Sequence, residues 1–343
     1  MAFLEIKNVA ITGISAGVPK QIMPTISTTD KYDADAFAET TGVLEKRYSN
    51  DFTTSDLGQA AAEQLIADLN WDKKEIGALV FVSQTPDYIL PATSCILQDK
   101  LGLSKDCMAL DVSLGCSGWV YGLSVISSLM QTGMIKKGIL IAGDARKQCY
   151  EEADQLFGFA GTATALEYQS GDAMQFHFGT DGSGFDAIIK PVGGCRNQVT
   201  AKDLEPVMCE DGRKRHGFQT LMKGMDVFAF GITTAPKSIK KLVAEYNLNT
   251  DNIEYYVFHQ ANRMMNETIR KKLKLTEEQV PYSMTHFGNT SSASIPLTIV
   301  TQLADKIADK KTELIGCGFG VGLSWGTVHF TTDHPVISKL VEL

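Results

Sequence analysis

Apolar and polar residues follow two different periods along this chain. Leu4–Ile14 alternates between the two kinds, which predicts a strand with Gly17 and Pro19 as turn residues beyond it. Ser55–Leu69 repeats its apolar residues at the spacing of an amphipathic helix. Ile76–Ser83 is rich in β-branched residues and predicts a buried strand. The beginning of the chain therefore combines strands with helices.

The same alternation continues beyond these elements. Ser94–Leu101 and Gly118–Gln131 have helical spacing, and the apolar run Gly138–Ala142 predicts another buried strand. This order is typical of an α/β fold with mostly parallel strands. A chain of 343 residues with 44% hydrophobic content can bury large cores. We expect two packed halves, residues 1–174 and 175–343.

The second half repeats the order of elements in the first, although no block of sequence is identical. The corresponding segments are Ala78–Val82 with Ile253–Phe258, Met108–Leu114 with Val280–Phe287, and Lys137–Gly143 with Lys311–Cys317. The correspondence predicts strands in the second half, with a helix from Ser292 after the second of them. If the halves pack face to face, the turns that hold Cys116 and Asn289 converge.

The segment Gly316–Gly326 is rich in glycine. It lacks the G-x-G-x-x-G spacing of a dinucleotide-binding loop, and it leads into the strand-like Leu323–Phe330 rather than into a helix. We interpret its glycines as positions where backbone N–H groups approach an active site. Tight packing alone is the alternative.

Composition and charge narrow the class of protein. The net charge of −8 argues against general nucleic-acid binding, and the apolar runs are too short to span a membrane. The first residues lack the basic and apolar stretches of a signal peptide. The seven cysteines include no C-x-x-C pair, and no histidine pair has ligand spacing, so we expect no metal site. An odd number of scattered cysteines indicates reduced thiols and a cytoplasmic protein.

Three short motifs carry residues that suit thioester chemistry. Cys116 lies in D-V-S-L-G-C-S-G-W, where a strand-like run breaks and restarts as a helix. His259 lies in F-H-Q-A-N, and Asn289 lies in H-F-G-N-T-S-S-A-S. A thiol at a helix N-terminus has a lowered pKa, and the other two side chains can hold a developing oxyanion or enolate. The remaining cysteines are interpreted as structural: Cys95, Cys107, Cys149, Cys195, Cys209 and Cys317.

Together with the terminal F-G-V-G-L-S-W-G segment, these motifs resemble those of β-ketoacyl-acyl-carrier-protein synthase III, in the thiolase-like superfamily. The resemblance covers essentially the whole chain, including the interval of 30 residues between His259 and Asn289. It implies an α/β, thiolase-like fold with two similar halves in a five-layered αβαβα arrangement. It also implies a homodimeric, cytoplasmic acyltransferase of fatty-acid biosynthesis. No metal or redox cofactor is needed, because loss of carbon dioxide drives the reaction.

The resemblance implies a role for each motif. Cys116 takes an acyl group from acyl-coenzyme A or an acyl carrier protein, and its own N–H and that of Val321 hold the oxyanion. His259 and Asn289 donate to the carbonyl oxygen of malonyl-acyl-carrier-protein. Decarboxylation then forms an enolate that attacks the acyl-cysteine, which is a decarboxylative Claisen condensation.

Further positions are also implied by the resemblance. Phe319 corresponds to a Phe that shapes the decarboxylation site, and Asn262 is expected to contact the pantetheine arm of the thioester. Leu90 takes the place of a Phe that reaches across the dimer to limit the partner's acyl tunnel, so we expect acceptance of acyl groups longer than acetyl. Core packing is the alternative for Leu90 and Phe319.

A basic cluster follows the histidine motif on a chain that is otherwise acidic. It consists of Arg263, Arg270, Lys271, Lys272 and Lys274. The resemblance implies that the cluster docks acyl carrier protein, which is acidic. Opposite charges would then raise the association rate, and salt would weaken the effect. A solvated helix face is the alternative.

The chain departs from the family pattern where coenzyme A binds. Ala36–Gly42 lacks the Trp and Arg that usually precede its T-G turn, and Met264 stands where an Arg is usual. Phe159 replaces the usual Asp, and an Arg expected upstream of it is missing. The reaction type is unaffected by these changes. The identity of the acyl donor, its chain length and its carrier stay open.

Other functions are alternatives. A papain-like cysteine hydrolase has the same order of Cys, His and Asn, with a similar separation of 143 residues between Cys116 and His259. The Gln that such an enzyme needs shortly before its nucleophile is absent. A specialised condensing enzyme or acyltransferase of a polysaccharide, quinolone or polyketide pathway fits the altered coenzyme A segment. A non-catalytic scaffold is disfavoured because Cys116, His259 and Asn289 are all present.

Overall fold

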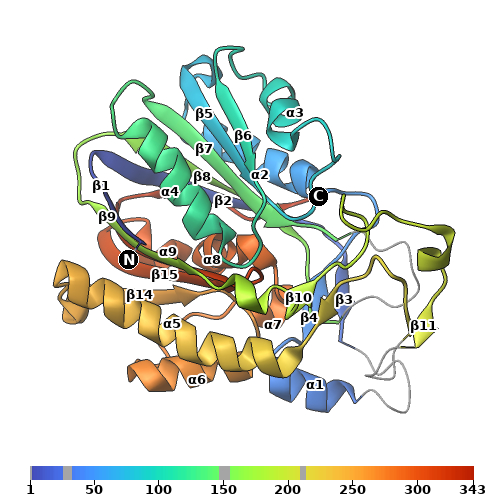
Figure 1. Ribbon diagram of the computed structural model, residues 1–343. Helices are drawn as coiled ribbons and strands as arrows, with labels where there is room; N and C mark the ends of the chain where they lie inside the picture. The colour runs from blue at the N-terminus through green and yellow to red at the C-terminus, as the bar shows by residue number, and fades with distance from the viewer. Residues whose placement is uncertain (1, 26–32, 147–154, 209–213) are drawn as a thin grey trace.

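The computed structural model describes residues 2–25, 33–146, 155–208 and 214–343, and two β-sheets form its centre (Figure 1). The first sheet has the order β17-β2-β8-β7-β5-β6, and β18 also pairs with β2. Its strands are β2 (Val9–Val18), β5 (Ile76–Val82), β6 (Met108–Val112), β7 (Lys137–Asp144), β8 (Ala160–Tyr168), β17 (Val336–Ile337) and β18 (Val341–Glu342). The neighbours β6, β5 and β7 are parallel, as the alternation of strands and helices predicts.

The second sheet has the order β1-β9-β16-β15-β14. Its strands are β1 (Ala2–Ile6), β9 (Met174–Thr180), β14 (Ile253–Phe258), β15 (Lys311–Gly320) and β16 (Ser324–Asp333). β14 and β15 are parallel, whereas the other pairs are antiparallel. Small ribbons lie outside the two sheets: β3 (Ile22–Pro24) with β4 (Glu45–Arg47), β10 (Ile188–Ile189) with β13 (Leu221–Met222), and β11 (Val207–Met208) with β12 (Lys214–Arg215).

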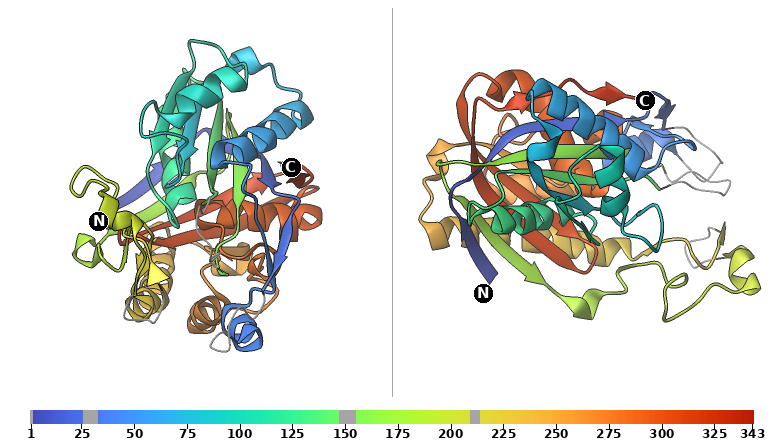
Figure 2. Two further views of the ribbon diagram at one scale, coloured as in Figure 1. Left: turned by 90° about the vertical axis from the view of Figure 1, so that its right-hand side faces the viewer. Right: turned by 90° about the horizontal axis from the view of Figure 1, so that it is seen from above.

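Helices separate the two sheets and cover their outer faces (Figures 1 and 2). α4 and α8 lie between the sheets, α2 and α3 cover the first sheet, and α5 and α6 cover the second. The expected five-layered αβαβα arrangement is therefore confirmed. The helices are α1 (Ala34–Thr41), α2 (Thr54–Asp68), α3 (Thr93–Lys100), α4 (Gly118–Met130), α5 (Gly224–Tyr246), α6 (Arg263–Leu273), α7 (Met284–Phe287), α8 (Ser294–Thr298) and α9 (Ala304–Ile307).

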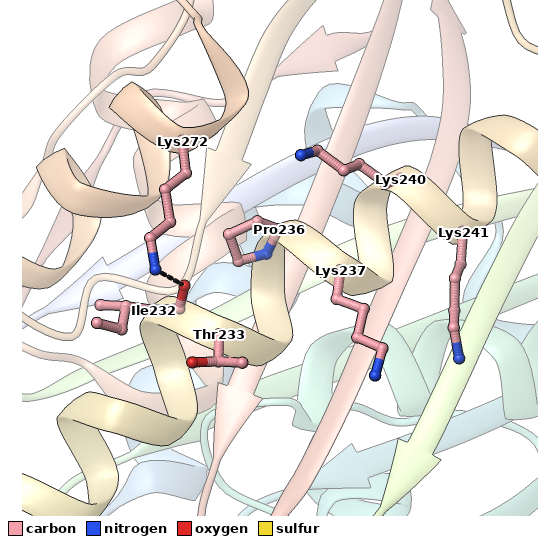
Figure 3. A pocket seen from close by; sticks show the side chains of 7 residues that line it. All are labelled: Ile232, Thr233, Pro236, Lys237, Lys240, Lys241 and Lys272. Carbon is pink, nitrogen blue, oxygen red and sulfur yellow. Dashed lines mark hydrogen bonds between the residues drawn. The ribbon is translucent and has the colours of Figure 1, made fainter.

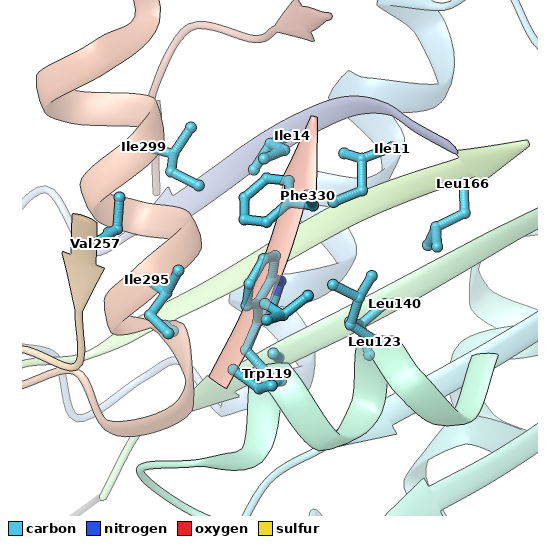
Figure 4. Close-up of a cluster of buried hydrophobic side chains, with 14 of the residues drawn as sticks. Ile11, Ile14, Trp119, Leu123, Leu140, Leu166, Val257, Ile295, Ile299 and Phe330 are labelled. Carbon is cyan, nitrogen blue, oxygen red and sulfur yellow. The ribbon is translucent and has the colours of Figure 1, made fainter. Parts of the chain in front are cut away.

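The core between the sheets draws side chains from both halves of the chain (Figure 4). Trp119 of α4 packs edge-on against Phe330 of β16, with ring centroids 5.8 Å apart. Its indole N–H donates to the Thr164 hydroxyl at 3.0 Å, which satisfies the polar atom of a buried Trp. Ile295 of α8 joins the same cluster. This packing holds the N-terminus of α4, next to Cys116, between the two sheets.

The single strand predicted over Leu4–Ile14 is wrong, because two strands occupy this segment. β1 pairs with β9 in the second sheet, whereas β2 pairs with β8 in the first. The chain changes direction between them at Asn8, whose φ of 60° lies in the left-handed region. Gly17, predicted to lie in a turn, is inside β2, where a Cβ atom would meet the carbonyl oxygen of Leu57 at 2.4 Å.

The halves predicted at residues 1–174 and 175–343 exchange their terminal strands. β1 belongs to the sheet of the second half, and β17 and β18 pair with β2 in the sheet of the first half. The predicted boundary falls at the first residue of β9, Met174. Both ends of the chain therefore tie the two sheets together.

The strand predicted over Val280–Phe287 is also wrong, although β14 and β15 confirm the strands predicted on either side of it. The segment is irregular up to the short helix α7. Pro281 lacks the N–H group that a strand ladder needs. The N–H groups of Ser283 and Met284 instead donate to the side-chain oxygen of Gln260, at 3.1 and 3.4 Å.

Candidate active site

Cys116 lies at the carboxyl edge of the first sheet, where ligands bind in many α/β folds. Val82 at the end of β5 pairs with Val112 of β6 on one side and with Ala142 of β7 on the other. Cys116 follows Val112 by one short turn and precedes the first residue of α4, Gly118. The predicted order of strand, turn and helix around Cys116 is confirmed.

The glycine-rich segment packs directly against this turn. A Cβ atom on Gly318 would lie 2.7 Å from the carbonyl oxygen of Cys116, and one on Gly320 would lie 2.6 Å from its Sγ atom. Both glycines belong to β15 of the second sheet. At these two positions the absence of a side chain lets β15 approach the turn of Cys116 closely.

The surroundings of Cys116 favour its thiolate. Burial by itself raises the pKa of the thiol, but the His259 imidazole, the Val321 backbone N–H and the charge of Arg146 outweigh it. The resulting pKa lies below the ordinary value of 9.0. Cys116 as a residue is only partly buried. The Val321 N–H, a predicted oxyanion donor, is directed at the thiol.

The backbone and the ring of His259 are both fixed. Its N–H donates to Cys317 in β15 at 2.8 Å, and its carbonyl oxygen accepts from the Asn266 side chain at 3.1 Å. The ring Nδ1 lies 3.0 Å from the hydroxyl of Ser294, which leaves Nε2 for the thiol and the substrate. When the Ser294 hydroxyl donates to Nδ1, the ring proton stays on Nε2 and can be donated. The predicted Phe319 packs edge-on against this ring, with centroids 5.8 Å apart.

Asn289 is held so that its amide N–H group is available. Its backbone N–H donates to Leu156 at 2.8 Å, and its side-chain oxygen accepts from the N–H of Ser291 at 2.9 Å. The side-chain Nδ2 lies 3.5 Å from the carbonyl oxygen of Ala261, two residues after His259. The structure thus brings the Cys116 thiol to the His259 imidazole, and it places Asn289 beside the segment that follows His259.

Two other predicted residues have additional roles in the fold. Asn262 is the N-cap of α6, and its side-chain oxygen accepts from the N–H of Met265 at 2.8 Å. Its amide nitrogen is not needed for this cap, so a contact with a pantetheine arm stays a prediction. Leu90 is 83% exposed and lies on the surface of the single chain beside Ile89, which is 91% exposed.

The basic cluster divides into internal and exposed residues. Arg270 donates to both carboxylate oxygens of Glu267 and to the carbonyl oxygen of Leu275, and its side chain is only 11% exposed. The guanidinium therefore bonds within the fold, and a docking role for Arg270 stays a prediction. Arg263, Lys271, Lys272 and Lys274 are exposed.

Beside the exposed residues, a cleft of about 450 Å³ lies between α5 and α6 (Figure 3). The Lys272 ammonium donates to the carbonyl oxygen of Ile232 at 2.9 Å across this cleft. Four of the residues that line it are lysines: Lys237, Lys240, Lys241 and Lys272. This lysine cleft extends the positive surface from α6 onto α5.

The described part of the chain meets neither the requirements for a metal site nor those for a membrane-spanning helix. It contains no group of three or more His, Cys, Asp or Glu side chains that could hold a metal ion. Within the same residues, no helix has both the length and the apolar character needed to cross a bilayer. Of the cysteines predicted to be structural, Cys149 and Cys209 lie outside the described residues.

Sequence reasoning missed Ser294 and Arg146. Ser294 is one of several serines in the Asn289 motif, and nothing in the linear pattern marks it as the partner of His259. Arg146 lies far from Cys116 along the chain, and no motif contains it. Arg146 comes just after the predicted strand Gly138–Ala142, which is parallel to the strand before Cys116. This position is the signal in the sequence that could have indicated Arg146.

A thiol at the start of a buried helix, faced by an imidazole and a carboxamide from the second half of a five-layered fold, defines a thiolase-like condensing enzyme that transfers acyl groups. Comparisons with known proteins identify the family. The model described as 3-oxoacyl-[acyl-carrier-protein] synthase III matches residues 110–182, and the model of its C-terminal part matches residues 243–332. The chain belongs to the 3-oxoacyl-[acyl-carrier-protein] synthase III family.

Relatives and solved structures agree with this assignment. The chain is 32% identical to the β-ketoacyl-[acyl-carrier-protein] synthase III of Clostridioides difficile, over 83% of this chain and 86% of that protein. It is 31% identical to the protein of the same name from Aliarcobacter butzleri, over 94% and 97%. A crystal structure of a 3-oxoacyl-(acyl-carrier protein) synthase from Burkholderia xenovorans has a TM-score of 0.92 at 34% identity, covering 100% of this chain and 99% of that one.

A polyketide enzyme shares the fold as well. The priming β-ketosynthase of the R1128 polyketide pathway has a TM-score of 0.80 at 20% identity, covering 98% of this chain and 99% of that one. At this identity the likeness shows the fold alone.

Proposed function

We propose that this enzyme condenses an acyl thioester with malonyl-acyl-carrier-protein through an acyl-Cys116 intermediate. The Cys116 thiolate attacks the thioester carbonyl, and the thiol of coenzyme A or of a carrier protein leaves. The observation that carries the proposal is the position of the thiol, between the His259 imidazole and the Val321 N–H, which together favour its ionised form. A papain-like hydrolase does not fit the family or the fold.

The second half-reaction uses the other two side chains. His259, with its proton on Nε2, and the Asn289 amide donate to the malonyl thioester carbonyl as carbon dioxide leaves and an enolate forms. The enolate carbon attacks the acyl carbonyl, the Cys116 thiolate leaves, and a 3-oxoacyl thioester is released. The nucleophile and the enolate donors act in different half-reactions, so they can be tested separately.

The test measures the two half-reactions apart. Intact mass should show an acyl adduct on the wild type after incubation with acyl thioesters, and no adduct on Cys116→Ala. His259→Ala and Asn289→Ala should abolish malonyl decarboxylation but retain some acylation, because acylation uses backbone donors. Each donor is worth about 10²–10³ in rate. No adduct on the wild type, or an equal adduct on Cys116→Ala, would refute the proposal.

We also propose that acyl carrier protein docks on the exposed face of α6 and along the lysine cleft. Carrier proteins are acidic, whereas this face carries Arg263, Lys271 and Lys272. Lys271→Glu combined with Lys272→Glu should raise the KM for malonyl-acyl-carrier-protein, and salt should do the same to the wild type. Acylation by a coenzyme A thioester should change little. Lys306→Glu, an exposed substitution on α9, is the matched control.

The enzyme is further proposed to act as a cytoplasmic homodimer in fatty-acid biosynthesis. A specialised pathway is the second candidate. It is favoured by Met264, which stands where an Arg is usual, and by Ala36–Gly42, which lacks the Trp and the Arg that bind coenzyme A in the family pattern. Comparing coenzyme A and carrier-protein donors of the same acyl group separates the two, because fatty-acid initiation requires efficient use of acetyl-coenzyme A.

A further inference from the structure

Three adjacent parallel strands deliver polar side chains to the same edge as the nucleophile. Val82 of the middle strand β5 pairs with Val112 of β6 on one side and with Ala142 of β7 on the other. Cys116 lies four residues after Val112, and Arg146 lies four residues after Ala142. Gln84 lies two residues after Val82, on the strand between the other two. The topology therefore places a carboxamide next to the turn of Cys116 and a guanidinium one strand further along the same edge of the sheet.

Contacts of Arg146 agree with this placement. Its guanidinium carbon lies 4.3 Å from the centre of the Phe157 ring, a cation–π contact that restricts the side chain. The backbone of Phe157 forms a parallel bridge with Asn289, and the N–H of Gly158 donates to the Asn289 carbonyl oxygen at 3.1 Å. Arg146 thus borders the segment that carries Asn289, and its charge acts on Cys116.

Arg146 has no anionic partner among the described residues. No carboxylate in that part of the chain forms an ion pair with it, although the side chain is only partly exposed. Asp144, two residues earlier, uses one carboxylate oxygen to accept from the Ser83 hydroxyl, the Gln84 N–H and the Thr85 hydroxyl, at 2.8 to 3.1 Å. A partly buried cation that faces no carboxylate is costly, and an anion supplied by the substrate would offset this cost.

Gln84 lies even closer to the nucleophile turn. Its side-chain oxygen lies 2.5 Å from the place that a Cβ atom on Gly115 would occupy, directly before Cys116. Its backbone is fixed by the hydrogen bond to Asp144, so the side chain leaves the end of β5 toward the thiol. A carboxamide here can donate to a polar group on the acyl chain, whereas an aliphatic chain would leave it unpaired.

We propose that Arg146, assisted by Gln84, binds a carboxylate on the acyl group, so that the preferred donor is an ω-carboxyacyl thioester, the monothioester of a dicarboxylic acid. The inference rests on the proposed function and specifies the acyl donor of that reaction. A planar guanidinium can donate two parallel hydrogen bonds to a carboxylate, which fixes the chain in one orientation. A methyl-ended acyl chain would desolvate the cation without replacing its hydrogen bonds.

The test compares donors matched in length. Glutaryl- and pentanoyl-coenzyme A have five carbons each, and adipyl- and hexanoyl-coenzyme A have six, so each pair differs in a terminal carboxylate. Acylation of Cys116, followed by intact mass, should favour the carboxylated member by about 10- to 100-fold, as expected for hydrogen bonds to a charged group. Arg146→Met should abolish this preference by slowing the carboxylated donors alone, and Arg146→Lys should retain part of it.

Other outcomes would overturn the inference in distinguishable ways. If Arg146→Met slows all donors equally and moves the pH midpoint of Cys116 alkylation upward, Arg146 acts on the thiol and does not select the substrate. If methyl-ended donors acylate the wild type as fast as carboxylated ones, the inference fails and the proposed condensation stands. If no donor acylates Cys116 although iodoacetamide does, the proposed function itself fails.

Discussion

Cys116 and Cys317 show how far the surroundings of one residue type can change its chemistry. Cys317 in β15 is buried, and burial raises the pKa of its thiol to about 12. Burial opposes ionisation of Cys116 as well, but His259 and the Val321 N–H reverse the effect and lower its pKa. One cysteine therefore has the environment that a nucleophile needs, and the other is part of the core.

We predict that iodoacetamide alkylates Cys116 with a midpoint below the ordinary thiol pKa of 9.0. A lowered pKa means that thiolate is already populated at lower pH, so the rate should rise earlier than for a free thiol. Peptide mass spectrometry separates Cys116 from the exposed Cys95 and Cys195, and Cys317 should stay unmodified while the protein is folded. His259→Ala should move the midpoint upward. An unchanged midpoint would contradict the contribution of the imidazole.

Gly320 leaves the space that the Cys116 thiol occupies. This steric role can be tested by adding one methyl group. In Gly320→Ala the new Cβ would lie 2.6 Å from Sγ and 2.7 Å from Cβ of Cys116, so the turn must move. We predict at least a tenfold loss of acylation and destabilisation of about 1–3 kcal/mol, as overpacking usually causes. Gly171→Ala is the control, because no atom lies within 4 Å of its added Cβ. Equal behaviour of the two variants in acylation and thermal unfolding would exclude this steric role.

The proposed catalytic residues could be singled out from sequence because each lies in a short motif of small or turn-forming residues. Ser294 and Arg146 could not, because their roles depend on which side chains the fold brings next to them. The 3.0 Å contact of Ser294 with His259 joins two separate elements, and Arg146 reaches the site through the pairing of parallel strands. Neither of these two positions can be recognised from the spacing of residues along the chain.

At the scale of elements, α6 is anchored by an ion pair as well as by its apolar face. Arg270 donates to Glu267 one turn earlier, and the hydroxyl of Tyr282 donates to the same carboxylate at 2.7 Å. The hydrogen bond from Arg270 lowers the pKa of Glu267. This network connects α6 to the irregular segment that leads to Asn289, so it supports both donors of the site.

Arg270→Ala should therefore destabilise the protein by about 1.5–3 kcal/mol, the range for hydrogen bonds to charged groups. Lys271→Ala, on the exposed face of the same helix, should stay within about 0.5 kcal/mol of the wild type. Because the folded pKa of Glu267 is lowered, its contribution is present above the unfolded pKa of 4.5 and is lost as pH falls through the folded value. Urea unfolding should show the Arg270→Ala penalty shrinking in acid, and a penalty independent of pH would contradict the ion pair.

Helices and buried strands of this chain could be predicted because periodicity reports burial directly. Ser55–Leu69 and α2 (Thr54–Asp68) agree within one residue at each end. The wrong strand predictions lie where the backbone of one residue determines the local structure. Asn8 interrupts an otherwise regular alternation through its left-handed φ, and Pro281 removes a donor from an apolar run that resembles a strand. The exchange of terminal strands between sheets depends on pairing over long distances and could not be predicted.

At the scale of the whole molecule, the tip that precedes α3 suggests how two copies meet. Tyr88, Ile89 and Leu90 are 62%, 91% and 83% exposed, and consecutive exposed apolar side chains favour association. In a homodimer this tip would bury its apolar area against the partner and place Leu90 at the partner's acyl tunnel. The surface position of Leu90 in the single chain is compatible with that role.

We predict that the wild type is a dimer in size-exclusion chromatography with light scattering and that Ile89→Asp shifts it toward monomer. The introduced carboxylate would have to be desolvated in the interface. Met134→Asp is the matched control, because Met134 is 86% exposed but lies outside this tip, between α4 and β7. A monomeric wild type, or equal effects of the two variants, would contradict this interface.

Leu90→Phe tests the contribution of the tip to the partner's tunnel. The larger and more rigid side chain should leave the dimer intact and reduce acylation by six- and eight-carbon donors more than by a two-carbon donor. The comparison uses donors on both coenzyme A and carrier protein, so that a carrier preference is not mistaken for a length limit. If Leu90→Phe leaves the chain-length profile unchanged while the protein stays dimeric, Leu90 does not limit the tunnel. A strict wild-type preference for acetyl-coenzyme A would refute the expected acceptance of longer chains.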